Sequence, residues 1–130
     1  MTYLIDSDWV IDWLANRRAA VALLRRLSAQ GICVSLITYA EVLDGVYHGQ
    51  DVTRYQRDFQ RFLQEAPVLP LTRLIMQRFA RIRGDLRLRG AIIPDMDLLI
   101  AATALHHDLT LVTRNVRHFE RVPALKLLRP

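Results

Sequence analysis

The chain has 130 residues, of which 52% are hydrophobic and 24% are charged, and this composition is typical of one globular domain. We therefore expect a single domain over residues 1–130. No apolar run reaches the roughly 20 residues that a membrane helix needs, and residues 1–6 lack the basic start and apolar region of a signal peptide. These features favour a cytoplasmic protein that does not bind a membrane. The single cysteine, Cys33, excludes a disulfide within the chain and is expected to be a buried, unreactive thiol.

The basic residues of the chain are almost all arginine. Lys126 is the only lysine among 18 basic residues, and the net charge is +5. A positive chain favours a polyanionic partner, and arginine is the better residue for bidentate phosphate contacts. The same charges can instead form only a solvated face that keeps the protein soluble.

The N-terminal half of the chain alternates strands with helices. Residues 2–5 predict a short buried strand that ends at Asp6, and the apolar spacing of residues 9–14 predicts a helix. Residues 17–30 predict an amphipathic helix that ends before a glycine. The nearly continuous apolar run 32–37 predicts a second strand that is covered on both faces, as strands of a parallel sheet are.

The C-terminal half continues the alternation. Residues 51–65 predict a helix, and the proline-flanked segment 66–71 predicts an edge strand, because proline cannot donate to a strand ladder. Thr72 is expected to cap a long helix that runs to about residue 89. Its buried stripe is predicted to consist of Leu74, Ile75, Phe79, Ile82 and Leu86. The remaining expected elements are a helix over 95–105, a strand over 109–113, a loop or helical turn over 114–119 and a last strand over 125–128.

The helix over residues 95–105 is apolar nearly all round after its two acids, so we expect it to be buried on most sides. Pro94 makes a helix start there plausible, with Asp95 as the candidate N-cap and Asp97 inside the first turn. Acids in a first turn commonly serve only to satisfy free N–H groups and to complement the helix dipole. The alternative is that these carboxylates belong to a site.

Two more acids follow strands. Asp6 comes at the carboxyl end of the first strand, where open parallel sheets bind their ligands, although it can also cap the next helix. Thr38 and Glu41 have the spacing of a capping box, in which Thr38 caps a helix that runs to about residue 48 and the glutamate bonds back to it. Glu41 therefore has both a structural and a functional interpretation.

Asp6, Glu41 and Asp97 can converge, because the carboxyl ends of neighbouring parallel strands meet at one edge of a sheet. Crowded carboxylates repel one another unless a cation or a shared proton compensates, and oxygen ligands suit Mg²⁺ or Mn²⁺. Other chemistries have less support, because the sequence contains no zinc-ligand spacing, no glycine-rich phosphate loop and no nucleophile elbow. The four histidines are expected to be surface or core residues rather than catalysts.

Four segments, taken in order, are similar to those of a known family. They are Leu4-Ile5-Asp6-Ser7, Thr38-Tyr39-Ala40-Glu41-Val42, Asp97-Leu98-Leu99-Ile100-Ala101-Ala102-Thr103-Ala104 and Leu111-Val112-Thr113-Arg114-Asn115-Val116-Arg117-His118-Phe119. Their order and spacing resemble those of the PIN-domain ribonucleases, specifically the VapC toxins of bacterial toxin–antitoxin pairs. The resemblance covers essentially the whole chain.

The resemblance implies an α/β fold like that of PIN domains, with a mostly parallel sheet of four to five strands and helices on both faces. It implies a Mg²⁺-dependent endoribonuclease, with Mn²⁺ as a substitute, in which Asp6, Glu41 and Asp97 are the catalytic residues and hold the metal. A water activated by the metal would cleave RNA, for which a tRNA or another structured RNA is expected. It also implies a VapB-type antitoxin that covers the site, and a homodimer formed through a helical face.

Further residues around these acids receive expected roles. Arg114 is the first candidate for a contact with RNA phosphate. Many relatives carry a further acid after the fourth strand, where this chain has Asn115 and His118, so we expect a second metal to bind weakly or through water. The residues expected to support the ligands or to hold that second metal are Asp95, Asn115, Ser7 and Thr113.

Two other functions compete with this interpretation. A phosphorylatable receiver domain has acids at strand ends in a similar fold, but it needs an aspartate after the third strand and a lysine at the fifth. Residues 68–71 contain no acid, and Lys126 lies within the last apolar segment. The second alternative is a catalytically inactive RNA- or protein-binding module that keeps the fold without the metal, and the presence of Asn115 instead of an acid leaves it open.

Overall fold

The computed structural model describes residues 1–129 and shows a five-stranded, all-parallel sheet in the order β3-β2-β1-β4-β5. The strands are β1 (Tyr3–Ile5), β2 (Ile32–Ser35), β3 (Val68–Leu69), β4 (Thr110–Val112) and β5 (Lys126–Leu127). The helices are α1 (Ser7–Leu14), α2 (Arg18–Ser28), α3 (Leu36–Tyr47), α4 (Val52–Glu65), α5 (Arg73–Leu88), α6 (Asp95–His106) and α7 (Val116–Phe119). The expected α/β architecture, with β3 at an edge of the sheet, is confirmed. Within residues 1–129, no helix is both long and apolar enough to cross a membrane.

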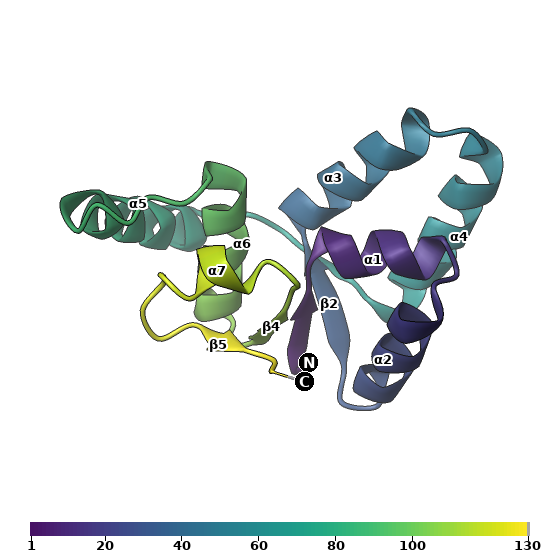
Figure 1. Ribbon diagram of the computed structural model, residues 1–130, viewed down its shortest axis with the longest axis horizontal. Helices are drawn as coiled ribbons and strands as arrows, with labels where there is room; N and C mark the ends of the chain where they lie inside the picture. Colours follow the sequence, from purple (N-terminus) through teal and green to yellow (C-terminus); the bar gives the residue numbers. More distant parts are fainter. Residues whose placement is uncertain (130) are drawn as a thin grey trace.

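The helices cover the two faces of the sheet in two groups (Figure 1), with α1 to α4 on one face and α5 to α7 on the other. Successive side chains of a strand point to opposite faces. Leu4 accordingly packs into the core beneath α5 to α7, whereas Ile5 packs into the core beneath α1 to α4. The central strand β1 therefore contributes to two separate hydrophobic cores.

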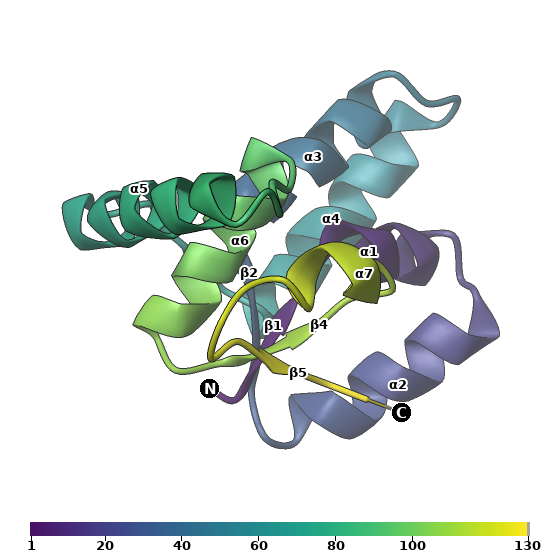
Figure 2. The ribbon, with the colours of Figure 1, turned by 60° about the vertical axis from the view of Figure 1, so that its left-hand side comes forward.

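Helix α6 is buried on most sides, as its sequence predicts. It packs between the sheet and α5 (Figure 2), and its small residues allow a close approach. Its buried residues are Leu98, Ile100, Ala101, Ala102, Thr103 and Ala104. Cys33 is also fully buried, and burial raises the pKa of its thiol to about 11, so the expectation of an unreactive thiol is supported.

The predicted capping box of α3 is wrong. The helix begins three residues earlier than Thr38 implies, because the hydroxyl of Ser35 accepts a hydrogen bond from the Thr38 N–H at 2.9 Å and caps the helix. The second strand correspondingly ends at Ser35 and not at Ile37. Apolar side chains alone could not distinguish the last strand residues from the first helical turn, since both are buried.

Two other predictions need correction. Asp95 is not the N-cap of α6, because Pro94 holds that position; Asp95 lies in the first turn and pairs with Arg83 at 2.9 Å. Leu74 is not part of the buried stripe of α5, since it is 60% exposed. The buried stripe begins one residue later, at Ile75, which is fully buried.

The corrected cap of α3 can be tested by two substitutions. Ser35→Ala removes the bond to the Thr38 N–H and should lower the free energy of unfolding by about 1 kcal/mol, or the melting temperature by a few degrees. Thr38→Val should leave stability unchanged or raise it, because the Thr38 hydroxyl is buried and has no hydrogen-bond partner among residues 1–129. Urea denaturation followed by circular dichroism measures both. A larger loss for Thr38→Val than for Ser35→Ala would restore the capping box.

Candidate active site

Asp6 lies where β1 ends and α1 begins, and it is buried. One carboxylate oxygen accepts a hydrogen bond from the Ser7 N–H at 2.8 Å, which caps α1. The other accepts from the Thr113 hydroxyl at 2.7 Å. Since Thr113 directly follows β4, this bond joins the carboxyl ends of two neighbouring strands, and both carboxylate oxygens of Asp6 are fixed in place.

Glu41 lies in the second turn of α3, beyond the reach of any capping role. Its Oε1 accepts a hydrogen bond from the Ser7 hydroxyl at 3.1 Å. Ser7 thus contacts Glu41 through its side chain while its backbone N–H contacts Asp6. The structural interpretation of Glu41 no longer competes with the functional one, because Ser35 caps the helix.

Asp97 lies in the first turn of α6, as predicted, and its carboxylate is mostly buried. Its Oδ2 lies 2.8 Å from Nδ1 of His118 and 3.3 Å from the side-chain nitrogen of Asn115. The expectation that the histidines are surface or core residues rather than catalysts stays a prediction, but His118, which is partly exposed, directly contacts a candidate site residue. In the resemblance to the PIN-domain ribonucleases, position 118 is one of the two places after the fourth strand where many relatives carry a further acid.

The electrostatics of these acids show that they share one site. Burial, and to a smaller extent the charges of Asp8 and Asp97, raise the pKa of Asp6 to about 6, although the hydrogen bonds from Thr113 and Ser7 act in the opposite direction. Burial also raises the pKa of Glu41, and the Asp97 and Asp8 carboxylates act in the same direction. Because the carboxylates destabilise one another's charged forms, a cation placed among them would lower the free energy of the site.

Asp8 belongs to this group of acids, because its charge acts on both Asp6 and Glu41. Burial raises its pKa, and its two oxygens accept hydrogen bonds from the backbone N–H groups of Trp9 and Arg114 at 2.7 and 2.9 Å. In the sequence, its position two residues after the expected site residue Asp6 indicates that Asp8 lies near the site. In an α-helix, a residue that closely follows the N-cap remains at the same end of the helix.

Arg114 lies beside the site but is already engaged. Its guanidinium forms an ion pair with Asp12, and it lies 3.8 Å above the centre of the Trp9 ring. Stacking on an aromatic face fixes the guanidinium plane and adds a cation–π attraction. Arg114 is thus held in one orientation near the acids, where a phosphate could replace Asp12 as its partner.

The donor set suits a hard divalent cation. Within residues 1–129, no three histidine, cysteine, aspartate or glutamate side chains are already assembled at ligand distances. Mg²⁺ usually binds to one or two carboxylates and keeps several waters, so it does not need such a closed cage. The carboxylates of Asp6, Glu41 and Asp97 are all oxygen donors with mutually unfavourable charge, and they would hold such an ion.

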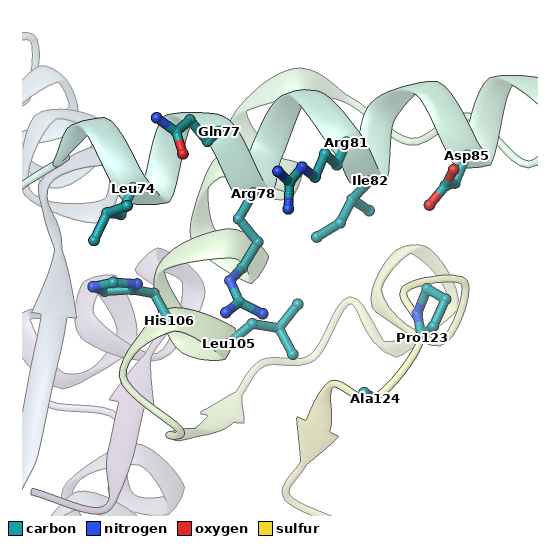
Figure 3. A pocket seen from close by; sticks show the side chains of 10 residues that line it. All are labelled: Leu74, Gln77, Arg78, Arg81, Ile82, Asp85, Leu105, His106, Pro123 and Ala124. Carbon is teal, nitrogen blue, oxygen red and sulfur yellow. The ribbon is translucent and has the colours of Figure 1, made fainter.

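The remaining residues divide into those near the acids and those away from them. Ser7, Thr113 and Asn115 contact the acids directly, whereas Asp95 is paired with Arg83 on α5. A pocket of about 480 Å³ lies elsewhere, between α5 and the end of α6 (Figure 3). None of the site acids (Asp6, Asp8, Glu41 and Asp97) lines it. Its walls include Arg78, Arg81 and His106. The site acids therefore lie near the opposite, N-terminal end of α6, where Asp97 is located.

Because Asp6 is buried with a raised pKa, the stability of the metal-free protein should depend on pH. The folded chain holds this proton up to a pH of about 6, whereas the unfolded chain releases it near 4. The free energy of unfolding should therefore fall as pH rises from about 4 to about 6. Asp6→Asn should remove this dependence and stabilise the protein at pH 7 by on the order of 2 kcal/mol.

Urea denaturation in excess chelator at several pH values measures this effect. Asp108→Asn is the matched control, since Asp108 is exposed, pairs with Lys126 and follows the end of α6 opposite to Asp97. An Asp6→Asn variant less stable than the wild type at pH 7 would show that the hydrogen bonds of the carboxylate outweigh its cost of burial.

Comparisons with known proteins identify the family of this chain. The family model for the PIN domain matches residues 3–125. Ribonuclease VapC2 of Haemophilus influenzae is 31% identical over 126 residues, which cover 97% of this chain and 96% of that protein. The tRNA(fMet)-specific endonuclease VapC of Shigella flexneri is 27% identical over 126 residues, with the same coverage of both chains.

Solved structures give the same result. The crystal structure of VapBC2 from Rickettsia felis, bound to a DNA fragment from its promoter, matches with a TM-score of 0.89 and 27% identity, covering 98% of each chain. The structure of VapBC-1 from nontypeable Haemophilus influenzae matches with a TM-score of 0.84, also at 27% identity, covering 98% of this chain and 97% of that one. This chain belongs to the PIN domain family and, within it, to the VapC proteins of toxin–antitoxin systems.

Proposed function

We propose that this chain is a Mg²⁺-dependent endoribonuclease that acts as the toxin of a toxin–antitoxin pair. The observation that carries the proposal is the convergence of Asp6, Glu41 and Asp97 from three separate segments. The charges of Asp97 and Asp8 contribute to the raised pKa values of Asp6 and Glu41, so the site favours a cation. Relatives named as VapC ribonucleases support the same activity.

The protein's own residues hold and orient the reacting groups. A bound divalent cation would supply positive charge to the scissile phosphate and make a bound water a better nucleophile. Thr113 and Ser7 fix the carboxylate of Asp6, and the backbone N–H of Asn115 donates to the Thr113 hydroxyl at 3.0 Å. That bond occupies a lone pair of Thr113 and directs its proton towards Asp6. No protein nucleophile is required.

The positive charge of the chain supports an RNA substrate. Arg114 is held on Trp9 beside the acids, and its partner Asp12 can be replaced by a phosphate group. Helix α5 carries further exposed arginines, and they are Arg73, Arg78, Arg81, Arg83 and Arg87. We propose a tRNA or another structured RNA as the substrate, because the relative from Shigella flexneri is named as a tRNA endonuclease.

A VapB-type antitoxin is the proposed protein partner, and we also propose a homodimer. Several structural neighbours are VapBC complexes. The chain itself offers an apolar groove of about 220 Å³ between α1, α3 and α4, with Ile11, Val42 and Tyr55 in its walls. Ile11 is 45% exposed and adds to the apolar surface of this groove, consistent with a surface that is covered in a complex.

An inactive PIN-fold module is the second candidate function. The observation in its favour is that Asp97 contacts Asn115 and His118 rather than another acid. Incubation with mixed cellular RNA and Mg²⁺ separates the two candidates, since only the nuclease produces metal-dependent fragments.

Substitution of Glu41 tests the carboxylate site directly. Glu41→Gln keeps the shape of the side chain and can still accept the Ser7 hydrogen bond, so the melting temperature should stay within a few degrees of the wild type. The lost negative charge should reduce Mg²⁺-dependent RNA cleavage by at least about 100-fold, because the variant binds the cation less well. Asp97→Asn should behave in the same way.

Glu65→Gln is the matched control, because Glu65 is exposed at the end of α4. It should cleave RNA at the wild-type rate. Normal cleavage by Glu41→Gln at limiting Mg²⁺ would remove Glu41 from the site and leave only Asp6 and Asp97.

Salt and chelation test the proposed substrate and cofactor. If arginines neutralise RNA phosphates, RNA affinity should fall steeply as salt rises, by orders of magnitude between about 50 and 200 mM. Excess chelator should stop cleavage without lowering helix content in circular dichroism. Cleavage that continues in chelator would indicate a metal-free ribonuclease and contradict the carboxylate mechanism.

A further inference from the structure

Two nitrogen groups from the segment after β4 meet a single oxygen of Asp97. Nδ1 of His118 lies 2.8 Å from Oδ2, and the side-chain nitrogen of Asn115 lies 3.3 Å from the same atom. The two nitrogens are themselves 2.7 Å apart. Neither Asp6 nor Glu41 has such a pair, since each accepts side-chain bonds from hydroxyl groups alone.

The direction of these bonds follows from the chemistry of the carboxylate. An ionised carboxylate can only accept, so both nitrogens that contact Oδ2 must donate to it. Nδ1 of His118 therefore carries a proton in this arrangement. Both nitrogens approach Oδ2 from the same side, because they lie only 2.7 Å apart. Within residues 1–129 no side chain donates to Oδ1, which is the oxygen of Asp97 that remains for another partner.

The backbone keeps His118 in this position. Its neighbour Phe119 is fully buried in the core beneath α5 to α7, which anchors the short helix α7 against α6. On the other side of the segment, the Asn115 N–H bonds to Thr113, which in turn bonds to Asp6. The donors to Asp97 are thus connected through one short segment to the carboxylate of Asp6.

From this geometry we infer that His118 is a positioning residue for Asp97. Its bond to Oδ2, with Asn115 on the same side, orients the carboxylate so that Asp97 presents Oδ1 to the site and the protein binds one divalent cation per chain. The inference rests on the proposed metal-dependent function and adds to it the number of ions. The N–H groups of His118 and Asn115 stabilise the negative charge at Oδ2, where a second cation would otherwise be needed.

Mn²⁺ binding measured by isothermal titration calorimetry tests the inference without RNA. The wild type should bind one ion. His118→Asn should keep its affinity, because the asparagine amide nitrogen can lie close to the position of Nδ1. His118→Leu should weaken binding by about 10- to 100-fold, the usual effect of losing a hydrogen bond to a ligand. The matched control His107→Leu removes an exposed imidazole at the other end of α6 and should change nothing.

His118→Asp provides a test in the opposite direction. It places a third acceptor oxygen beside Oδ2 of Asp97 and should raise the stoichiometry to two ions, because adjacent carboxylates need a cation between them. RNA cleavage adds a kinetic readout, in which His118→Leu should lower kcat with KM for RNA unchanged. Because partial unfolding would also lower kcat at unchanged KM, kcat is expressed per folded molecule, with the folded fraction measured by circular dichroism.

The possible failures are distinguishable. A wild type that binds no divalent cation, with no cleavage, overturns the proposed function and the inference with it. A wild type that binds Mn²⁺ and is matched by His118→Leu in affinity and in kcat overturns the inference alone. Two ions in the wild type also overturn it, while the proposed function stands. If His118→Leu does not fold, equal stoichiometry in the wild type and in His118→Asp overturns it instead.

Discussion

The structure depends on the burial of one charged group, the carboxylate of Asp6, at the point where the central strand ends. Burial alone makes its ionised form costly, and nearby acids add to that cost. The hydrogen bonds from Ser7 and Thr113 offset only part of it. Asp6 therefore caps α1 at a cost in burial of its charge, and a cation bound beside it would remove part of that cost.

The site lies at the junction of the two hydrophobic cores. Asp6 and Glu41 belong to segments that pack with α1 to α4, whereas Asp97 and His118 belong to the group of α5 to α7 (Figure 1). Parallel strands bring both groups to the same edge of the sheet, because all of their carboxyl ends point in one direction. Small shifts between the two groups would change the spacing of the acids directly.

The acidic site lies within a strongly basic chain, and this contrast has a physical use. Long-range positive charge attracts a polyanion, whereas the bare acids would repel its phosphates at close range. A cation among the acids would remove that repulsion. Arg114, fixed by Trp9 and Asp12, lies at the boundary between the two regions, and Asp12 keeps its charge paired when no phosphate is present.

The sequence by itself determined the alternation of strands and helices, the burial of α6 and the positions of Asp6, Glu41 and Asp97, because hydrophobic periodicity and short motifs are local signals. The boundary between β2 and α3 could not be located, since the same apolar residues fit either structure and the choice of Ser35 as cap depends on where the chain bends. The roles of Asp8 and His118 were decided only by the tertiary structure. Asp8 is 106 residues from Arg114, and His118 is 21 residues from Asp97, so each contact forms only when separate segments pack together. No local pattern encodes a hydrogen bond across such distances along the chain.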